Sequence, residues 1–191
     1  QSGMSPDIVS VIEEGRRQGC LTLAITNTPG SPLANMADLV LDLEAGEEKA
    51  VAATKTYTTE LMAIAMLSAA MADCKECWRP LARLPGWVRK ALKQDTNTKR
   101  MAERYCYMSQ CVVLGRGFNY ATAFEWALKL KELTYVEAEP YSSADFMHGP
   151  IAMIEGGFPV MAVAPQGKVF ESMLELLGRL RAMSDVQNLL V

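Results

Sequence analysis

The chain has 191 residues, of which half are apolar and 21% are charged, a composition typical of a soluble globular protein. This length suits one large domain or one and a half ordinary ones. The formal net charge of −3 gives no reason to expect nucleic acid or an anionic membrane as a partner. No apolar run approaches the roughly 18 residues that span a bilayer, and no signal peptide is visible at the polar start.

The five cysteines are scattered along the chain, at Cys20, Cys74, Cys77, Cys106 and Cys111. An odd number without a regular framework predicts reduced thiols and a cytoplasmic location. Cys74 and Cys77 have the spacing of half a zinc site, but no second pair and no nearby histidine completes it. We therefore expect helix-surface or core thiols here and no metal site.

Helices and strands are predicted to alternate in the first part of the chain. The opening turn leads into a helix that Ser5 can cap, Pro6 can begin and Gly19 can end. A buried strand at 21–27, a short helix at 33–37 and a second strand at 38–44 follow, and then a long apolar helix at 52–72. This alternation is typical of an α/β fold in which helices cover a parallel sheet.

The same pattern begins again after two helices at 79–93 and 96–105. A strand at 110–117 ends in a glycine turn, and a helix at 119–137, a buried strand at 158–165 and a helix at 167–183 come next. We therefore predict parts of two related, doubly wound domains, at 1–74 and 106–191, joined by a helical linker at 75–105. Both ends look cut, so we expect a segment of a longer protein.

Two polar stretches of the first part could bind a small ligand. Hydroxyls and free backbone N–H groups in the turn from Gln1 to Ser5, at the start of a helix, could hold a phosphate. Plain capping by Ser5 is the alternative, and the turn taken alone slightly favours it. The small residues within 46–60 could let a ligand approach the backbone, or they could form a loop that leads into a buried helix. Composition favours these two interpretations equally.

A third stretch carries charged groups at helical spacing. Glu125, Lys129 and Glu132 fall at i, i+4 and i+7 on one helix face, and Lys131 points elsewhere. They could be a solvated face whose ion pairs contribute little. The rest of the helix is apolar, however, and the loop that follows carries His148, the only histidine, before a Gly-Pro turn. A histidine near two carboxylates and a lysine favours proton transfer.

Four stretches together carry a family resemblance: "QSGMSPD", "AVAATKTYTTEL", "LGRG" and "EWALKLKELTYVEAEPYSSADFMHGP". They resemble the tandem sugar isomerase (SIS) domain family, which includes the isomerase half of glucosamine-6-phosphate synthase and stand-alone phosphosugar isomerases and deaminases. The resemblance implies two doubly wound α/β domains of the flavodoxin-like, three-layer αβα type, a homodimer and no cofactor.

The resemblance also implies roles for single residues. Gln1, Ser2 and Ser5 match a loop that holds the sugar phosphate, and Val51 matches a backbone contact with the sugar. Glu132 matches the base that moves a proton between C1 and C2, and Lys129 matches a lysine beside it. His148 matches the residue that opens the sugar ring, which in dimers is donated across the interface. Glu125 matches a carboxylate at the substrate site whose role stays open.

The predicted function is that of an enzyme acting on a hexose 6-phosphate, such as fructose 6-phosphate or glucosamine 6-phosphate. Isomerisation or deamination ranks above amidotransfer, because no glutaminase part is seen. A phosphosugar-binding module without catalysis is the alternative from another class, and it would need the phosphate loop but not Glu132 and His148. A structural oligomerisation segment would account for the helix at 52–72 but not for the polar helix face.

Overall fold

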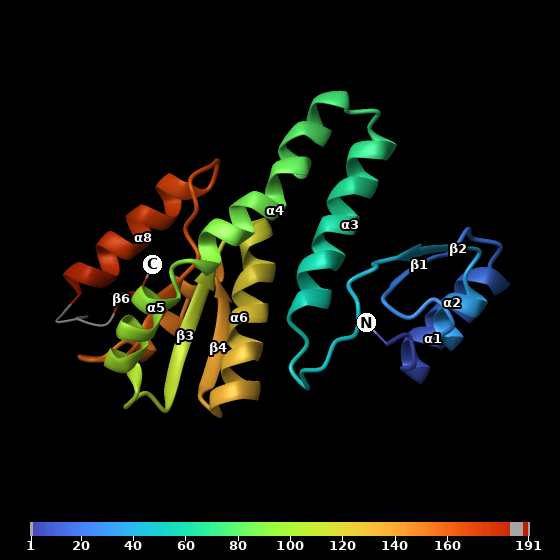
Figure 1. Ribbon diagram of the computed structural model, residues 1–191. Helices are drawn as coiled ribbons and strands as arrows, with labels where there is room; N and C mark the ends of the chain where they lie inside the picture. Colours follow the sequence, from blue (N-terminus) through green and yellow to red (C-terminus); the bar gives the residue numbers. More distant parts are fainter. Residues whose placement is uncertain (1, 184–188, 191) are drawn as a thin grey trace. The chain divides into compact units, whose positions relative to one another are not determined.

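The computed structural model describes residues 2–183 and 189–190 (Figure 1). The chain divides into two compact units, 1–94 and 95–191, and each is described by itself. The division falls inside the segment 75–105 that the sequence predicts as a linker. The domain limits at 74 and 106 stay predictions.

The first unit is built on two parallel strands. β1 (Leu23–Thr26) pairs with β2 (Leu39–Asp42) in a register that sets Leu23 opposite Leu39. Residues 24 and 26 of β1 are buried and alternate with half-buried neighbours, the period of two expected of a strand with one face against a core. α1 (Pro6–Arg17) precedes this pair, and α2 (Pro32–Met36) connects its strands.

A helical hairpin completes the first unit. α3 (Lys55–Met71) is followed by a single 3-10 turn, η1 (Lys75–Cys77), and by α4 (Trp78–Leu92). α3 begins three residues later than the sequence predicts, because Thr54 is its N-cap and has a non-helical backbone. The buried Ala52 therefore lies in the loop before the helix.

Cys74 and Cys77 form a disulfide across η1, so the prediction that they are reduced thiols is wrong. The 3-10 turn between them holds their Cα atoms 5.4 Å apart, within the range that bonded cysteines require. Spacing alone could not distinguish this arrangement from two thiols on a helix. Cys20, Cys106 and Cys111 are free, as expected.

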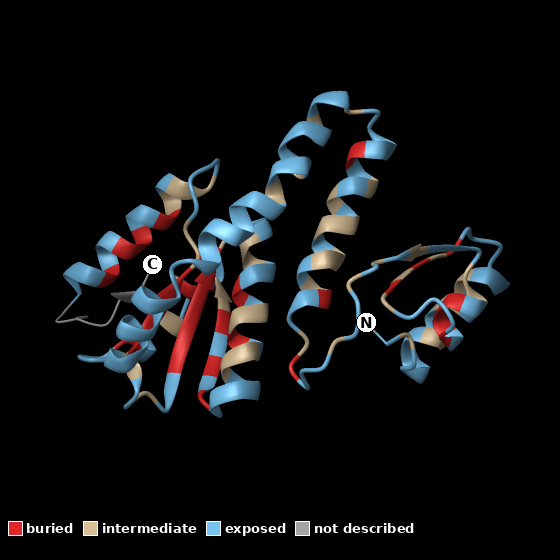
Figure 2. Cartoon of the chain, viewed as in Figure 1, coloured by how far each residue is buried: buried red, intermediate tan, exposed pale blue. Residues whose placement is uncertain are grey.

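The second unit contains a four-stranded parallel sheet with the order β4-β3-β5-β6. Its strands are β3 (Gln110–Gly115), β4 (Glu137–Ser142), β5 (Val160–Ala162) and β6 (Leu189–Leu190). Residues 111–115 of the central strand β3 are all buried, as a strand covered on both faces must be (Figure 2).

Helices cover both faces of this sheet. α6 (Phe118–Thr134) follows β3, and its Ala123 and Ala127 pack with Val113 on one face. α8 (Phe170–Ala182) lies on the other face (Figure 1). Its Met173 packs with Leu114 in the same core cluster. The remaining elements are short: α5 (Asp95–Ala102), η2 (Glu103–Tyr105), α7 (Ser143–Phe146) and η3 (Pro150–Met153). The parallel sheets and their covering helices confirm the predicted α/β class.

One predicted helix extends past the observed end of α6, and the strand that follows it was not predicted. The helix predicted at 119–137 ends at Thr134, because Tyr135 adopts a left-handed conformation with φ of 59°. The chain then enters β4 at Glu137. Residues 137–140 alternate between exposed and buried, the two-residue period of a strand whose two faces differ in burial.

No helix within the described residues is both long enough and apolar enough to cross a membrane.

Candidate functional site

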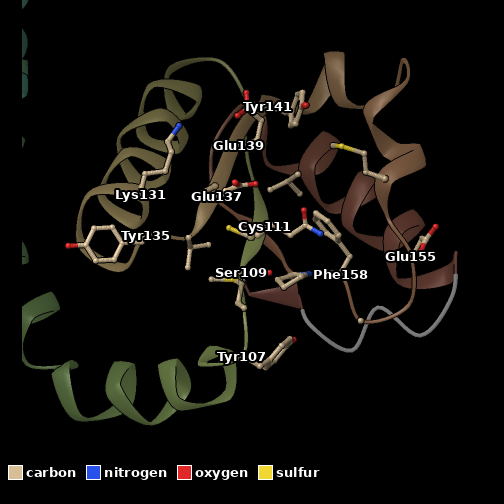
Figure 3. A pocket seen from close by; sticks show the side chains of 18 of the residues that line it. Tyr107, Ser109, Cys111, Lys131, Tyr135, Glu137, Glu139, Tyr141, Glu155 and Phe158 are labelled. Carbon is tan, nitrogen blue, oxygen red and sulfur yellow. The ribbon is translucent and has the colours of Figure 1, made fainter.

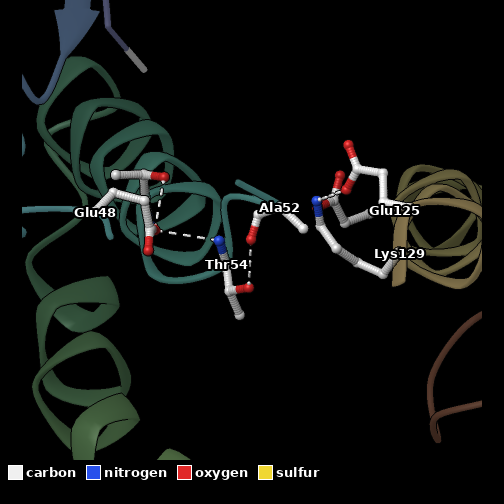
Figure 4. A network of polar contacts seen from close by, with 7 residues as sticks. Glu48, Ala52, Thr54, Glu125 and Lys129 are labelled. Carbon is white, nitrogen blue, oxygen red and sulfur yellow. Dashed lines mark hydrogen bonds and ion pairs between the residues drawn. The ribbon is translucent and has the colours of Figure 1, made fainter. Parts of the chain in front are cut away.

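Three charged side chains meet on one face of α6. Lys129 Nζ lies 2.7 Å from Glu132 Oε2 and 3.2 Å from Glu125 Oε1. The side chains of Glu125 and Lys129 are 20% exposed, and that of Glu132 is 37% exposed. The predicted grouping is therefore present, and it is drawn in part in Figure 4. An ammonium group lies between two carboxylates at the edge of solvent.

The fold of α6 explains why this face is free. Ala123 and Ala127 are fully buried against the sheet, so residues on the opposite side of the helix point away from it. The start of the helix is held by a close turn at Gly115, where an added Cβ would lie 2.3 Å from the carbonyl oxygen of Asn119. Only glycine fits at this position, and the turn sets the direction in which α6 leaves the sheet.

The carboxylates change the acid–base behaviour of the lysine between them. The hydrogen bond to Glu132 raises the pKa of Lys129 above its ordinary value; partial burial opposes the rise, and Glu125 adds to it. The ammonium form is therefore favoured. In this arrangement Lys129 supplies a fixed positive charge, and Glu132, the more exposed carboxylate, has the better access to a ligand.

His148 lies elsewhere in the second unit. It is exposed and follows α7, where its backbone N–H donates to the carbonyl of Asp145. The cavity that it lines includes Arg116 and Arg179 but none of the three α6 residues. Within one chain, the structure does not bring His148 and Glu132 to the same cavity.

The predicted phosphate turn lies at the start of the first unit. Ser5 occupies the N-cap of α1, but its side chain makes no capping hydrogen bond, which differs from the predicted cap. The Ser5 hydroxyl therefore accepts no hydrogen bond from the N–H groups of the first turn. Ser2 is exposed and its Oγ accepts a weak bond of 3.4 Å from the N–H of Met4. Gln1 lies outside the described residues.

Ser2 also lines a hollow of about 490 Å³ beside the carboxyl ends of β1 and β2. Asn27 and Thr28, directly after β1, line it as well, and Asn27 bonds the backbone at Ala45 and Gly46. The sequence analysis did not identify the acidic residues of this hollow, which are Asp42, Glu44, Glu47 and Glu48. Carboxylates accept hydrogen bonds from hydroxyl groups, so the hollow favours a ligand with hydroxyls.

One of these acids organises the start of α3. A single oxygen of Glu48 accepts bonds of 3.2 Å from the N–H of Thr54, the N–H of Thr56 and the hydroxyl of Thr56 (Figure 4). These bonds lower the pKa of Glu48, with the backbone bond from Thr56 as the largest cause. In the sequence, the adjacent acids Glu47 and Glu48 before a run of small residues were the feature that could have indicated this interaction. Val51 lies in the same loop and is fully exposed.

A cavity of about 1030 Å³ lies along the amino-terminal half of β3 and beside β4 (Figure 3). Its lining includes tyrosines 107, 135 and 141 and the carboxylates of Glu137, Glu139 and Glu155. Lys131 also lines it, which confirms that this lysine points away from the Glu125–Lys129–Glu132 face. No predicted site residue contributes to this cavity.

The fold and the α6 cluster together define a class of protein: an α/β protein with parallel sheets and an ion-paired carboxylate on a helix beside the sheet. The profile of the SIS domain matches residues 1–70 and 108–184, and the chain belongs to the SIS domain family.

Named relatives of this family are similar over nearly the whole chain. The glutamine–fructose-6-phosphate aminotransferase (isomerizing) of Methanosarcina acetivorans is 38% identical over an alignment 191 positions long, which covers 95% of this chain and 31% of the relative. The Escherichia coli K12 protein of the same name is 36% identical, with the same coverage. The chain thus spans about a third of the length of these relatives.

Solved structures agree with this assignment. The C-terminal domain of the glucosamine-fructose-6-phosphate aminotransferase of Francisella tularensis has a TM-score of 0.84 and 32% identity, over 95% of this chain and 54% of that one. A candidate phosphosugar isomerase of Silicibacter pomeroyi has a TM-score of 0.89 and 37% identity, over 96% and 55% of the two chains. A glucosamine-6-phosphate deaminase of Thermotoga maritima, 22% identical, shares the fold.

Proposed function

We propose that the protein moves a proton between C1 and C2 of a hexose 6-phosphate, as a phosphosugar aldose–ketose isomerase or an amino-sugar-phosphate deaminase. The observation that carries this proposal is the position of Glu132 on α6, 2.7 Å from the ammonium of Lys129 and accessible to solvent. A carboxylate held in a fixed geometry is a suitable general base, and such groups typically accelerate proton transfer about 10²–10⁴-fold.

In the proposed reaction Glu132 acts on the open-chain sugar. With a ketose, its carboxylate takes the proton from C1. The electron pair of the broken C–H bond forms the C1–C2 double bond, and the π electrons of the C2 carbonyl move to O2, which takes up a proton to give an enediol. The same carboxylate then returns its proton to C2, while O1 releases its hydroxyl proton and C1 becomes the aldehyde carbon. One proton thus passes from C1 to C2 and one is exchanged from O1 to O2, so none is gained or lost overall. One base can serve both carbons because they are adjacent. Lys129 keeps Glu132 in position through their ion pair.

The sugar phosphate is proposed to bind at the first turn of α1. The uncapped Ser5 leaves a hydroxyl and a helix N-terminus for an anion, and Ser2 adds a second hydroxyl. Gln1 belongs to the same proposed loop. Val51 is proposed to contact the sugar through its backbone, since it lies in the exposed loop before α3. The carboxylates beside Ser2 would accept bonds from sugar hydroxyls.

His148 is proposed to open the ring of a sugar that is bound to a second protomer. Its imidazole is exposed and lines a cavity that does not include Glu132, which fits donation across an interface better than action within one chain. A homodimer is supported by large apolar side chains of α6 that stay exposed, namely Phe118, Phe124, Leu128 and Leu133. For a proposed cytoplasmic location, the exposed free thiols of Cys20 and Cys106 are support, and the Cys74–Cys77 disulfide counts against it.

A second candidate uses the same base in a different setting. The chain would be part of the isomerase half of a glutamine–fructose-6-phosphate aminotransferase, in which ammonia from glutamine enters the product. The names of the relatives at 36–38% identity favour this candidate. The proton transfer proposed for Glu132 is common to both.

The test is to incubate the intact protein with glucosamine 6-phosphate and with fructose 6-phosphate, each with and without ammonia or glutamine. Product without a nitrogen donor supports isomerisation or deamination, and product that requires glutamine supports the second candidate. Glu132→Gln should remove turnover in either case and leave phosphosugar binding intact. Glu14→Gln is the matched control, because Glu14 forms a comparable ion pair with Arg17 on α1. Unchanged turnover in Glu132→Gln would remove Glu132 from the reaction, and binding without turnover in the unmodified protein would indicate a non-catalytic phosphosugar-binding module.

A further inference from the structure

A small polar cavity lies in the second unit, apart from the Glu125–Lys129–Glu132 face. Its volume is about 350 Å³. It is lined by side chains from the turn after β3, from the segment 143–148 and from α8, and the polar ones are those of Arg116, Ser143, His148, Ser172, Glu175 and Arg179. Three of these six side chains are basic and two are hydroxyls.

The cavity occupies the position where parallel sheets most often bind ligands. β3 and β5 are neighbours in the sheet, but the helix after β3 packs on one face and the helix after β5 packs on the other. The connections therefore separate at the carboxyl ends of these strands and leave a crevice. Arg116 follows Gly115, the last residue of β3, and so extends from the edge of the sheet at which this crevice opens.

The charges around the cavity do not balance. Arg179 is paired with Glu175, with 2.8 Å between Nη2 and Oε1. Arg116 has no such partner: within residues 2–183 its side chain has one hydrogen bond, of 3.3 Å from Nη1 to Oγ of Ser143, and no ion pair. One guanidinium charge is therefore left uncompensated, beside an imidazole that can donate a further hydrogen bond.

The contact with Ser143 also indicates that Arg116 is held in place. Ser143 is 2% exposed and begins α7, whose N-terminus is capped by the side chain of Ser142. A guanidinium group carries five N–H donors in a fixed fork, and one bond to a neutral hydroxyl uses one of them. A purely structural arginine at a half-buried position would be expected to reach a carboxylate or several carbonyl groups. Arg116 lines the cavity, and its remaining donors are left for a ligand.

We propose that this cavity binds a phosphate group through Arg116, with Arg179, His148 and the hydroxyls of Ser143 and Ser172 around it. A phosphate presents several oxygens that match the guanidinium fork, and its negative charge offsets that of Arg116. This site is separate from the phosphate turn at Ser2 and Ser5, which lies in the other unit. The phosphate could be inorganic or part of a phosphate ester, and both are compared below.

The experiment measures phosphate binding to the intact protein by titration calorimetry, with inorganic phosphate in one arm and a hexose 6-phosphate in the other. Arg116→Gln should weaken binding of inorganic phosphate at this site by at least about tenfold. Arg181→Gln, which removes an exposed arginine of α8 outside the cavity, should have no effect. Tighter binding of the hexose 6-phosphate that also depends on Arg116 would identify an ester as the ligand.

Two further variants keep the outcome clear. A Ser5→Ala background weakens the other proposed phosphate site, and the Arg116-dependent binding should persist in it. Ser172→Asp places a carboxylate in the cavity without removing Arg116 and should also weaken binding, which covers the case in which Arg116→Gln fails to fold. Equal phosphate binding by the unmodified protein, Arg116→Gln and Ser172→Asp would overturn the proposal. Because turnover is not the readout, failure here is distinguishable from failure of the Glu132 reaction.

Discussion

Lys129 Nζ lies 2.7 Å from Oε2 of Glu132, three residues further along α6. The same ammonium reaches Glu125 at 3.2 Å, so a single cation holds two carboxylates that lie about two helical turns apart. Because the rest of this helix is largely apolar or turned towards the sheet, the cluster is the main chemical feature of its free face.

Removing the ammonium should disturb the base. In Lys129→Met, Glu132 loses the partner that orients it, and we expect kcat with a hexose 6-phosphate to fall by up to about 10²-fold with a smaller change in KM. Steady-state kinetics of the intact protein measures this. A kcat equal to that of the unmodified protein would show that the ion pair does not position Glu132.

The same substitution predicts a difference at alkaline pH. Since the folded-state pKa of Lys129 is raised, its contribution to stability is complete below the unfolded value of about 10.4 and is lost as pH rises through the higher folded value. The difference in unfolding free energy between the unmodified protein and Lys129→Met should therefore shrink above about pH 10.4. Urea unfolding at a series of pH values checks this, and a constant difference would contradict it.

Glu48 should stabilise the start of α3 in the opposite pH range. Its folded-state pKa is lowered, so its contribution is present above the unfolded value of about 4.3 and is lost as pH falls through the lower folded value. Glu48→Ala should lower the thermal midpoint at neutral pH, with a smaller effect at pH 3. Glu47→Ala is the control, because the backbone carbonyl of Glu47, not its carboxylate, bonds Lys55. Equal effects of the two substitutions would refute the capping role of Glu48.

Much of this organisation follows from sequence patterns. Apolar periodicity predicts most helices and strands within a few residues, and the spacing of Glu125, Lys129 and Glu132 predicts their common face. β4 escapes prediction because Tyr135 ends α6 without a glycine and because Glu137 and Glu139 resemble a continued helix face. The acids around Ser2 escape because they come from β2 and the loop after it, and only folding brings them to one hollow.

Two glycines should respond oppositely to the same substitution. Gly115→Ala places a Cβ 2.3 Å from a backbone oxygen and 2.8 Å from a backbone carbon of Asn119, so we expect a loss of about 1–3 kcal/mol in unfolding free energy. Gly178 lies inside α8 with open space around it, and Gly178→Ala should gain about 0.5–1 kcal/mol. Chemical denaturation measures both, and a tolerated Gly115→Ala would contradict the close turn.

Thiol labelling should separate the five cysteines into three groups. Cys111 is only 2% exposed, and its burial raises the pKa of the thiol to about 11. Both effects should make it resist alkylation in the folded protein. Cys20 and Cys106 should react at once, and Cys74 and Cys77 should react only after a reductant is added. Mass spectrometry after labelling with iodoacetamide reads each group. Labelling of Cys74 without a reductant would contradict the disulfide.

The most direct test of the central claim is hydrogen exchange at the sugar. The intact protein is incubated with fructose 6-phosphate in deuterated water, and incorporation of deuterium at C1 is followed by proton NMR. Proton transfer by Glu132 predicts enzyme-dependent deuterium at C1 with the unmodified protein, and with Glu14→Gln, but none with Glu132→Gln, although that variant still binds the sugar phosphate. Deuterium incorporation by Glu132→Gln at the rate of the unmodified protein would contradict it.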